Sequence, residues 1–115
     1  MEFSIIGTIE NEMSDTLNLS GFEIFPSDAV WVQKPPESIG GNSKGTFEAK
    51  GGGNGVDLAG KIVYNPAGTT IPLTLTFFVD GETNKATATY PMPGPTVNAS
   101  ITPGPNAQAT YSYSR

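Results

Sequence analysis

The fold of this chain is decided by one stretch, Ile71-Pro72-Leu73-Thr74-Leu75-Thr76-Phe77-Phe78-Val79. Apolar residues occupy every odd position of the stretch, which is the period of a β-strand that buries one face. Its threonine, valine, isoleucine and phenylalanine residues suit a pleated surface. We therefore predict a strand over residues 71–79 whose core-facing side chains are Ile71, Leu73, Leu75, Phe77 and Val79.

A turn and further alternating segments surround this strand. Asp80-Gly81-Glu82 has the composition of a turn and residues 83–90 alternate again, so residues 71–90 predict a β-hairpin. Proline and glycine clusters separate most of the other segments. Proline ends a strand because it cannot donate a hydrogen bond to the neighbouring strand. We predict these other strands over residues 2–10, 16–20 (with an extension to Phe25), 29–34, 43–50, 56–64, 96–102 and 107–114.

The number and spacing of these strands indicate the fold class. No segment repeats apolar residues at helical spacing over ten or more positions. Short strands with frequent turns indicate a sandwich or a barrel, and the proline-rich breaks favour corners between two sheets. The chain of 115 residues suits one domain. The prediction is an all-β protein, folded over residues 1–115 as a single antiparallel β-sandwich of eight or nine short strands.

Two glycine features accompany the strands. The run Gly51-Gly52-Gly53-Asn54-Gly55 lacks the lysine and the following helix of a phosphate-binding loop, so we predict a flexible hairpin loop. Gly60 lies within the strand predicted over residues 56–64, where we expect two backbones to approach closely.

The composition of the chain excludes several kinds of chemistry. It contains no cysteine and no histidine, which excludes disulfides, thiolate metal sites, histidine-ligated zinc and the histidine-dependent catalytic triads and dyads. Paired carboxylates of the kind used by glycosidases exist at Glu10 with Glu12 and at Glu37 with Glu48, but no pattern places either pair in a cleft. We expect a protein that is not an enzyme and uses neither a metal nor another cofactor.

The charge pattern and the N-terminal residues limit the classes of binding partner and the cellular location that we expect. The formal net charge is −5, and the six basic residues are scattered along the chain, so nucleic acid is not an expected partner and attraction to anionic lipid is weak. Residues 1–20 do not resemble a signal peptide, and no apolar run is long enough for a transmembrane helix. We expect a cytoplasmic protein, or one released without a signal peptide; removal of a leader would make it a secreted one.

Aromatic residues supply the candidates for ligand or lipid binding. Trp31 is the only tryptophan and lies between two valines. Either it anchors a ligand or membrane at one end of the sandwich, or it packs between the sheets, and the alternation around it does not decide. Phe78 is out of phase with the buried face of its strand, which favours either an exposed binding surface or a second packed face. The full candidate set is Trp31, Tyr64, Phe78, Tyr111 and Tyr113.

The order of several short motifs resembles the aegerolysin-type β-sandwich proteins, and more loosely the actinoporin-like group of membrane-active sandwiches. The resemblance covers roughly residues 5–90, and the chain departs from the family in its shorter length, its lack of cysteines and its single tryptophan. It implies a β-sandwich that binds membrane lipid or acts as a cytolytic toxin. The motifs are Ile9-Glu10-Asn11-Glu12-Met13, Leu17-Asn18-Leu19, Trp31 before Pro35-Pro36-Glu37-Ser38-Ile39, Gly45-Thr46-Phe47-Glu48-Ala49, Gly60-Lys61-Ile62-Val63-Tyr64 and the strand over residues 71–79.

Three functional classes remain open from the sequence. The first is a module that binds membrane lipid or lyses membranes, and the second is a lectin-like module that binds a glycan surface. The third is a structural, self-assembling protein. The predicted strands over residues 97–101 and 107–113 contain neither charge nor proline, so either of them at a sheet edge predicts a homodimer. In that case a lysine at Thr110 or Ser112 would favour the monomer.

Overall fold

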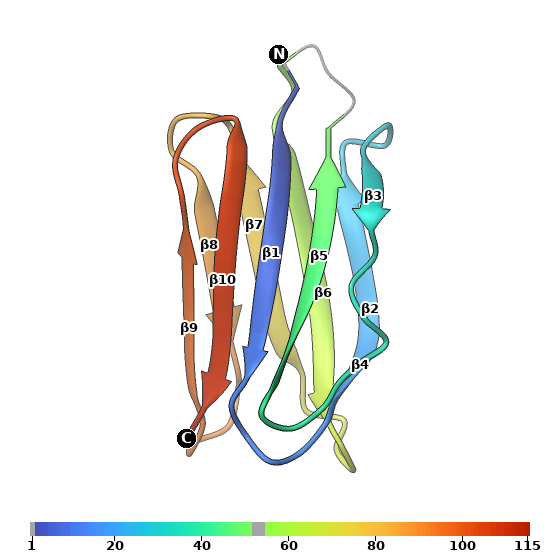
Figure 1. The fold of residues 1–115 in the computed structure, drawn as a ribbon, viewed down its shortest axis with the longest axis vertical. Coiled ribbons are helices and arrows are strands. Elements are labelled where there is room, and N and C mark those ends of the chain that lie inside the picture. The colour runs from blue at the N-terminus through green and yellow to red at the C-terminus, as the bar shows by residue number, and fades with distance from the viewer. Residues whose placement is uncertain (1, 52–54) are drawn as a thin grey trace.

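The computed structural model describes residues 2–51 and 55–115, which form ten β-strands and no helix (Figure 1). The predicted all-β class is therefore confirmed, with ten strands in place of eight or nine. The additional strand is a short one within residues 37–42, where the sequence predicted a loop. Residues 52–54 of the glycine run lie outside the described residues. The strands are β1 (Ser4–Asn11), β2 (Leu17–Phe25), β3 (Val30–Gln33), β4 (Ser38–Ile39), β5 (Ser43–Lys50), β6 (Leu58–Pro66), β7 (Leu73–Val79), β8 (Lys85–Thr89), β9 (Thr96–Ile101) and β10 (Asn106–Ser114).

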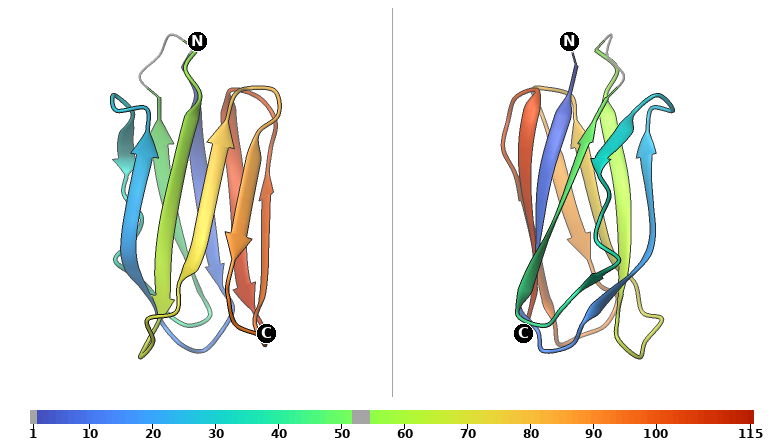
Figure 2. Two further views of the ribbon diagram at one scale, coloured as in Figure 1. Left: turned by 180° about the vertical axis from the view of Figure 1, so that it is seen from behind. Right: turned by 45° about the vertical axis from the view of Figure 1, so that its right-hand side comes forward.

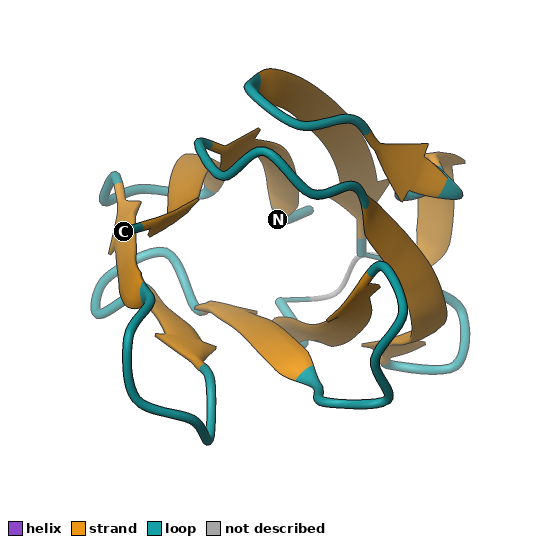
Figure 3. Cartoon of the chain, turned by 90° about the horizontal axis from the view of Figure 1, so that it is seen from below, coloured by secondary structure: helices purple, strands orange, loops and turns teal. Residues whose placement is uncertain are grey.

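The strands form two five-stranded sheets that pack face to face (Figures 2 and 3). Sheet A has the order β3-β5-β1-β10-β9, and sheet B has the order β4-β2-β6-β7-β8. All paired neighbours are antiparallel except β1 and β10, which pair in parallel. The prediction of a wholly antiparallel sandwich is wrong at this pair. The two strands come from opposite ends of the chain, so no tight turn imposes an antiparallel arrangement on them.

The core lies between the sheets and follows the predicted alternation. Leu73, Leu75, Phe77 and Val79 are all buried on β7. Ile71 is only half-buried, because β7 begins two residues later and Ile71 lies in the preceding loop. The buried hydrophobic residues of the other strands and their flanks are Phe3, Ile5, Ile9, Leu17, Ile39, Phe47, Ala49, Leu58, Ile62, Tyr64, Ala107, Ala109, Tyr111 and Tyr113.

Two glycines make room for phenylalanine rings in this core. A Cβ atom on Gly7 would lie 2.1 Å from the ring of Phe47, and one on Gly60 would lie 2.2 Å from the ring of Phe77. The two rings stack on each other with their centroids 5.7 Å apart. The close approach predicted at Gly60 is made by the Phe77 ring and also by a second backbone, since the carbonyl oxygen of Glu23 would lie 3.1 Å from the same Cβ atom, and a side chain at either glycine would displace a buried ring.

The ends of each sheet decide which strands could pair with another chain. β10 lies between β1 and β9, so of the two strands that could have formed an edge, the one over residues 107–113 is interior, whereas β9 is an edge of sheet A. Thr110 and Ser112 belong to β10, so a lysine at either position does not test pairing at an edge. A homodimer through β9 stays a prediction. β9 lies beside β8, the edge of sheet B, and β3 and β4 are the edges on the opposite side (Figure 1).

Candidate functional site

Four of the exposed large hydrophobic side chains belong to β2 and β3, which follow each other in the chain. Phe25 has the largest exposed fraction, 62%. The other exposed large hydrophobic residues in residues 2–51 and 55–115 are Ile6, Val56 and Met92, and they are scattered in the sequence. Clusters of exposed apolar side chains mark interaction sites more often than single ones do. We refer to the cluster as the edge patch, and it consists of Phe22, Phe25, Val30 and Val32.

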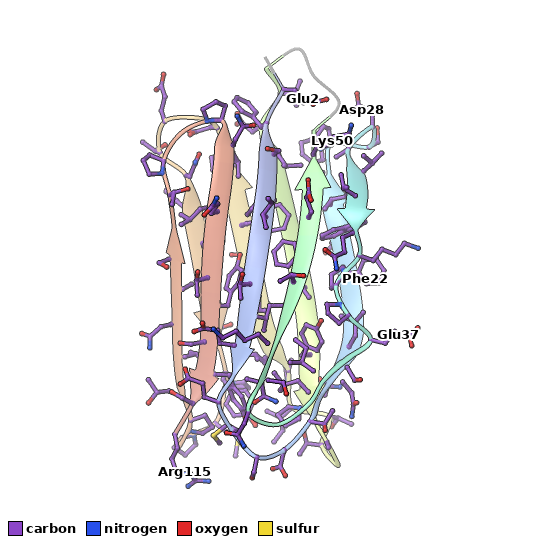
Figure 4. The ribbon with its side chains drawn as sticks, in the orientation of Figure 1. Glu2, Phe22, Asp28, Glu37, Lys50 and Arg115 are labelled. Carbon is purple, nitrogen blue, oxygen red and sulfur yellow. The ribbon has the colours of Figure 1, made fainter. Side chains whose placement is uncertain are left out.

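The edge patch exists because the chain crosses there from one sheet to the other (Figure 2). Phe22 pairs with buried Ile62 in the β2–β6 register and so faces inward. The short strand β4 pairs only with the start of β2, so no strand of sheet B lies beyond Phe22. On β3 the register shifts between Trp31 and Gln33, which leaves Val32 without a partner residue on β5. Figure 4 shows Phe22 at this rim, on the same side of the molecule as Asp28 and Glu37.

Trp31 connects the edge patch to the core. It pairs with buried Ala49 in the β3–β5 register, so its side chain faces inward, and it is half-buried. Its ring meets those of Phe47 and Phe77 edge-on at centroid distances of 5.9 and 6.3 Å, and that of Phe22 at 5.6 Å. Aromatic pairs of this kind each contribute about 0.5–1.5 kcal/mol beyond their buried area. Trp31 therefore packs between the sheets, which is one of its two alternatives, and also contacts exposed Phe22. Its role as a ligand or membrane anchor stays a prediction.

The segment that follows β3 holds this side of the sandwich closed. The hydroxyl of Tyr64 donates a hydrogen bond of 2.7 Å to the carbonyl oxygen of Pro36, and the Leu19 amide donates one of 2.8 Å to the carbonyl oxygen of Glu37. Burial raises the pKa of the Tyr64 hydroxyl well above its ordinary value. These two hydrogen bonds therefore attach residues 34–37 to sheet B.

The three candidate tyrosines lie in the core and not at a ligand surface. Tyr64 and Tyr111 are 0% and 1% exposed, and the Tyr111 hydroxyl donates a 2.7 Å hydrogen bond to the carbonyl oxygen of Thr76 in the opposite sheet. Burial raises the pKa of Tyr111 well above its ordinary value. Burial and, to a lesser extent, a hydrogen bond with Tyr90 raise the pKa of Tyr113 to about 12. Their assignment to ligand binding does not fit this burial, since inward-facing strand positions present no ring to solvent.

Phe78 lies on the outer face of sheet B, as its phase predicted. It pairs with Ala59 on β6, and Ala59 pairs in turn with Phe25 on β2, so two phenyl rings flank one small side chain. In the next row, the carboxylate of Glu23 lies 3.8 Å from the ammonium group of Lys61. A shallow pocket of about 220 Å³ opens here, and its lining residues are Glu23, Ile24, Phe25, Ala59, Gly60 and Lys61.

A second pocket, of about 360 Å³, contains one of the candidate carboxylate pairs. Glu10 and Glu12 both line it, and the Glu10 carboxylate lies 3.4 Å from the ammonium group of Lys44. Buried Asn11 lies between them and donates hydrogen bonds to the carbonyl oxygens of Asp15, Ile39 and Gly40, so it joins two loops. Glu37 and Glu48 do not line this pocket.

The rest of the described structure adds two observations about metals and membranes. Within residues 2–51 and 55–115, no three acidic, histidine or cysteine side chains gather closely enough to hold a metal ion. The same residues contain no helix that is long and apolar enough to cross a membrane.

The sequence contained a signal for the edge patch that its strand pattern did not use. Val30, Trp31 and Val32 are three consecutive apolar residues in a short strand. Because alternate side chains of a strand point to opposite faces, three in a row cannot all face one core. An exposed apolar residue was therefore required at this place, whereas Phe22 and Phe25 became exposed only through the position of β2 in the sheet.

The comparisons with known proteins concern the fold. No family model matches the sequence, and no curated protein sequence matches it. The crystal structure of the lipid binding protein Nakanori is similar to this structure with a TM-score of 0.71 and 16% sequence identity, over 98% of this chain and 71% of that chain. At this identity the likeness shows a shared β-sandwich fold. Membership in the aegerolysin family stays a prediction.

Proposed function

We propose that this protein is a non-enzymatic β-sandwich that binds membrane lipid through the edge patch. The observation that carries the proposal is that four exposed hydrophobic side chains belong to the adjoining strands β2 and β3 at one rim of the molecule, and that one of them, Phe22, contacts the ring of half-buried Trp31. Surfaces of this kind in otherwise polar proteins contact membranes or partner proteins. The structural similarity to a lipid binding protein favours the membrane.

The composition of the patch suits a shallow position in the membrane. Tryptophan favours the level of the lipid headgroups, and apolar side chains beside it can enter the boundary of the acyl chains. Glu23 and Asp28 are exposed within the same segment and would stay in water. Full burial of one such hydrophobic side chain contributes about 1.5–3 kcal/mol, so four of them can support reversible binding after the cost of association is subtracted.

The charge of the chain indicates which lipids suit the patch. With a net charge of −5, the protein is repelled by membranes rich in anionic lipid, because no basic cluster compensates. We therefore propose zwitterionic or uncharged lipids as the partners.

Co-sedimentation with phosphatidylcholine vesicles tests the proposal. We expect the unmodified protein to bind, and the fluorescence of Trp31, the only tryptophan, to shift to shorter wavelength as water leaves the patch. Val32→Ser should weaken binding about tenfold, since it removes roughly one buried apolar side chain from the contact.

A matched control distinguishes the patch from general hydrophobicity. Met92 is 49% exposed, close to the 53% of Val32, and lies in the loop between β8 and β9. Met92→Ser should leave vesicle binding unchanged. An equal loss of binding in both variants, or no binding by the unmodified protein, would reject the edge patch as the lipid-binding surface.

Membrane lysis, which the aegerolysin resemblance implies, is a further step that shallow binding does not require. Release of a trapped dye from the same vesicles would extend the proposed function to cytolysis. Binding without release would limit the protein to the membrane surface.

A further inference from the structure

We infer that the pocket on the outer face of sheet B binds the sugar headgroup of an uncharged glycolipid, an inference that rests on the proposed lipid-binding function. The pocket and the edge patch share Phe25, which lines the pocket and is 62% exposed. A group held in the pocket therefore lies at the border of the proposed membrane contact, where a lipid headgroup would be.

An apolar row that starts in the pocket with Phe25 and Ala59 and continues beyond its lining to Phe78 suits one face of a sugar ring. Phe25, Ala59 and Phe78 are paired across β2, β6 and β7. Adjacent strands are about 4.8 Å apart, which separates the two phenylalanine backbones by about 10 Å. The small Ala59 side chain between them leaves the floor low enough for the C–H face of a hexose to lie against aromatic surface.

The polar row beside it suits the hydroxyl groups of the same ring. Glu23, Lys61, Thr76 and Thr87 follow one another across β2, β6, β7 and β8, and the hydroxyls of Thr76 and Thr87 are hydrogen-bonded to each other. The side chains of Glu23 and Lys61 are 70% and 53% exposed and accessible to a ligand. A carboxylate only accepts hydrogen bonds and an ammonium group only donates them, whereas a sugar hydroxyl does both.

The charge of the pocket favours a neutral headgroup over a phosphate. Lys61 is the only basic residue that lines it, and Glu23 compensates its charge at 3.8 Å. Recognition of phosphate uses uncompensated cations, and arginine in particular. The only arginine of the chain is Arg115, which Figure 4 shows at the far end of the molecule from β3.

The experiment compares phosphatidylcholine vesicles with and without a minor fraction of a monohexosylceramide, using co-sedimentation of the full chain. We expect the glycolipid to raise the apparent affinity about tenfold, the effect of one or two net hydrogen bonds. A soluble methyl hexoside should compete for this increase and leave binding to plain vesicles unaffected.

Two substitutions test whether the sugar binds in the pocket. Ala59→Leu fills the floor from the outer face of the sheet, and Lys61→Met removes the donor without adding bulk. Both should abolish the increase and preserve binding to plain vesicles. Thr89→Leu adds a leucine to the same face of β8 outside the pocket and serves as the control, and circular dichroism melts establish that each variant is folded.

The outcomes separate the two proposals. Equal binding to both kinds of vesicle rejects the sugar site while the lipid-binding function stands. An increase that survives in both pocket variants places the sugar elsewhere and also rejects the inference. If the pocket variants lose binding to plain vesicles, the pocket contacts phospholipid instead, and if the unmodified protein binds neither vesicle, the proposed function itself is wrong.

Discussion

The two open sides of the sandwich are closed in different ways. On the side of β8 and β9, the inward-facing residues are mostly small and half-buried, namely Ala86, Ala88, Val97, Ala99 and Ile101. On the side of β3 and β4, the rings of Trp31 and Phe22 occupy the corresponding space, and residues 34–37 cross from one sheet to the other. One side is thus closed by close approach of two edges, and the other by a connecting segment and large rings.

This difference shows which apolar residues the packing of the two sheets requires and which it does not. Small inward residues allow the edges of the two sheets to meet, and neither β8 nor β9 exposes a large hydrophobic side chain. The opposite side exposes several, although polar residues at Val30 and Val32 would leave the core between the sheets intact. Folding therefore does not account for the edge patch, which supports its interpretation as a binding surface.

The largest expected effect concerns the core that both sides share. The Phe47 ring contacts Trp31 on one side and Tyr111 toward the other. Phe47→Ala should lower the free energy of unfolding by about 3–5 kcal/mol, because a buried ring leaves a cavity. Urea unfolding measures the loss. The exposed substitution Val32→Ser should change stability by no more than about 0.5 kcal/mol, so similar losses would contradict the proposed separation of core and patch.

An intermediate effect is expected from enlarging a residue on the β8–β9 side. Ala99→Leu should destabilise the protein by about 1–3 kcal/mol, since the added atoms push the two edges apart. Val30→Leu, at an exposed position on the other side, provides the control and should be nearly neutral. Thermal unfolding of the two variants compares the sides directly, and an insensitive Ala99 would show that the β8–β9 side is not closely packed.

The smallest effect concerns the tyrosine hydroxyls that join the layers. Burial raises the pKa values of Tyr64 and Tyr111 in the folded state, while unfolded tyrosine titrates near 10. Above about pH 10 the unfolded chain therefore releases protons that the folded chain retains, and stability falls as pH rises. Below that pH the contribution of these residues is constant.

Conservative variants assign this alkaline loss to the two hydroxyls. Tyr64→Phe releases the segment over residues 34–37 from its hydrogen bond to Pro36 and should cost about 1 kcal/mol at neutral pH. Tyr111→Phe should cost a similar amount through the lost bond to Thr76. The stability of each variant should fall less steeply with rising alkaline pH than that of the unmodified protein. Unchanged pH profiles would mean that other groups cause the loss.

Much of the strand pattern follows from the sequence because β-strand periodicity is a local property. Nine of the ten strands begin within about two residues of their predicted positions, within the usual scatter of strand boundaries. The prediction for the core of β7 is confirmed except at Ile71. β4 was not predicted because it has only two residues, Ser38 and Ile39, which are too few to show a period.

The candidate site was far less predictable. Alternation assigned Tyr111 and Tyr113 to one phase of their strand, but phase does not tell which face is covered. Both proved to be buried, whereas Phe78 faces outward from sheet B. Phe22 and Phe25 were not candidates, because their exposure depends on the partner strands of β2.

The sequence by itself determined the all-β class, most strand positions and the absence of histidine and cysteine chemistry, because composition and period-2 alternation are properties of short segments. Only the tertiary structure decided that β1 and β10 pair in parallel, that β10 is interior and that Phe25, Ala59 and Phe78 form one row. These relations join residues that are distant in the chain. Strand order and register, which no single segment encodes, place them side by side.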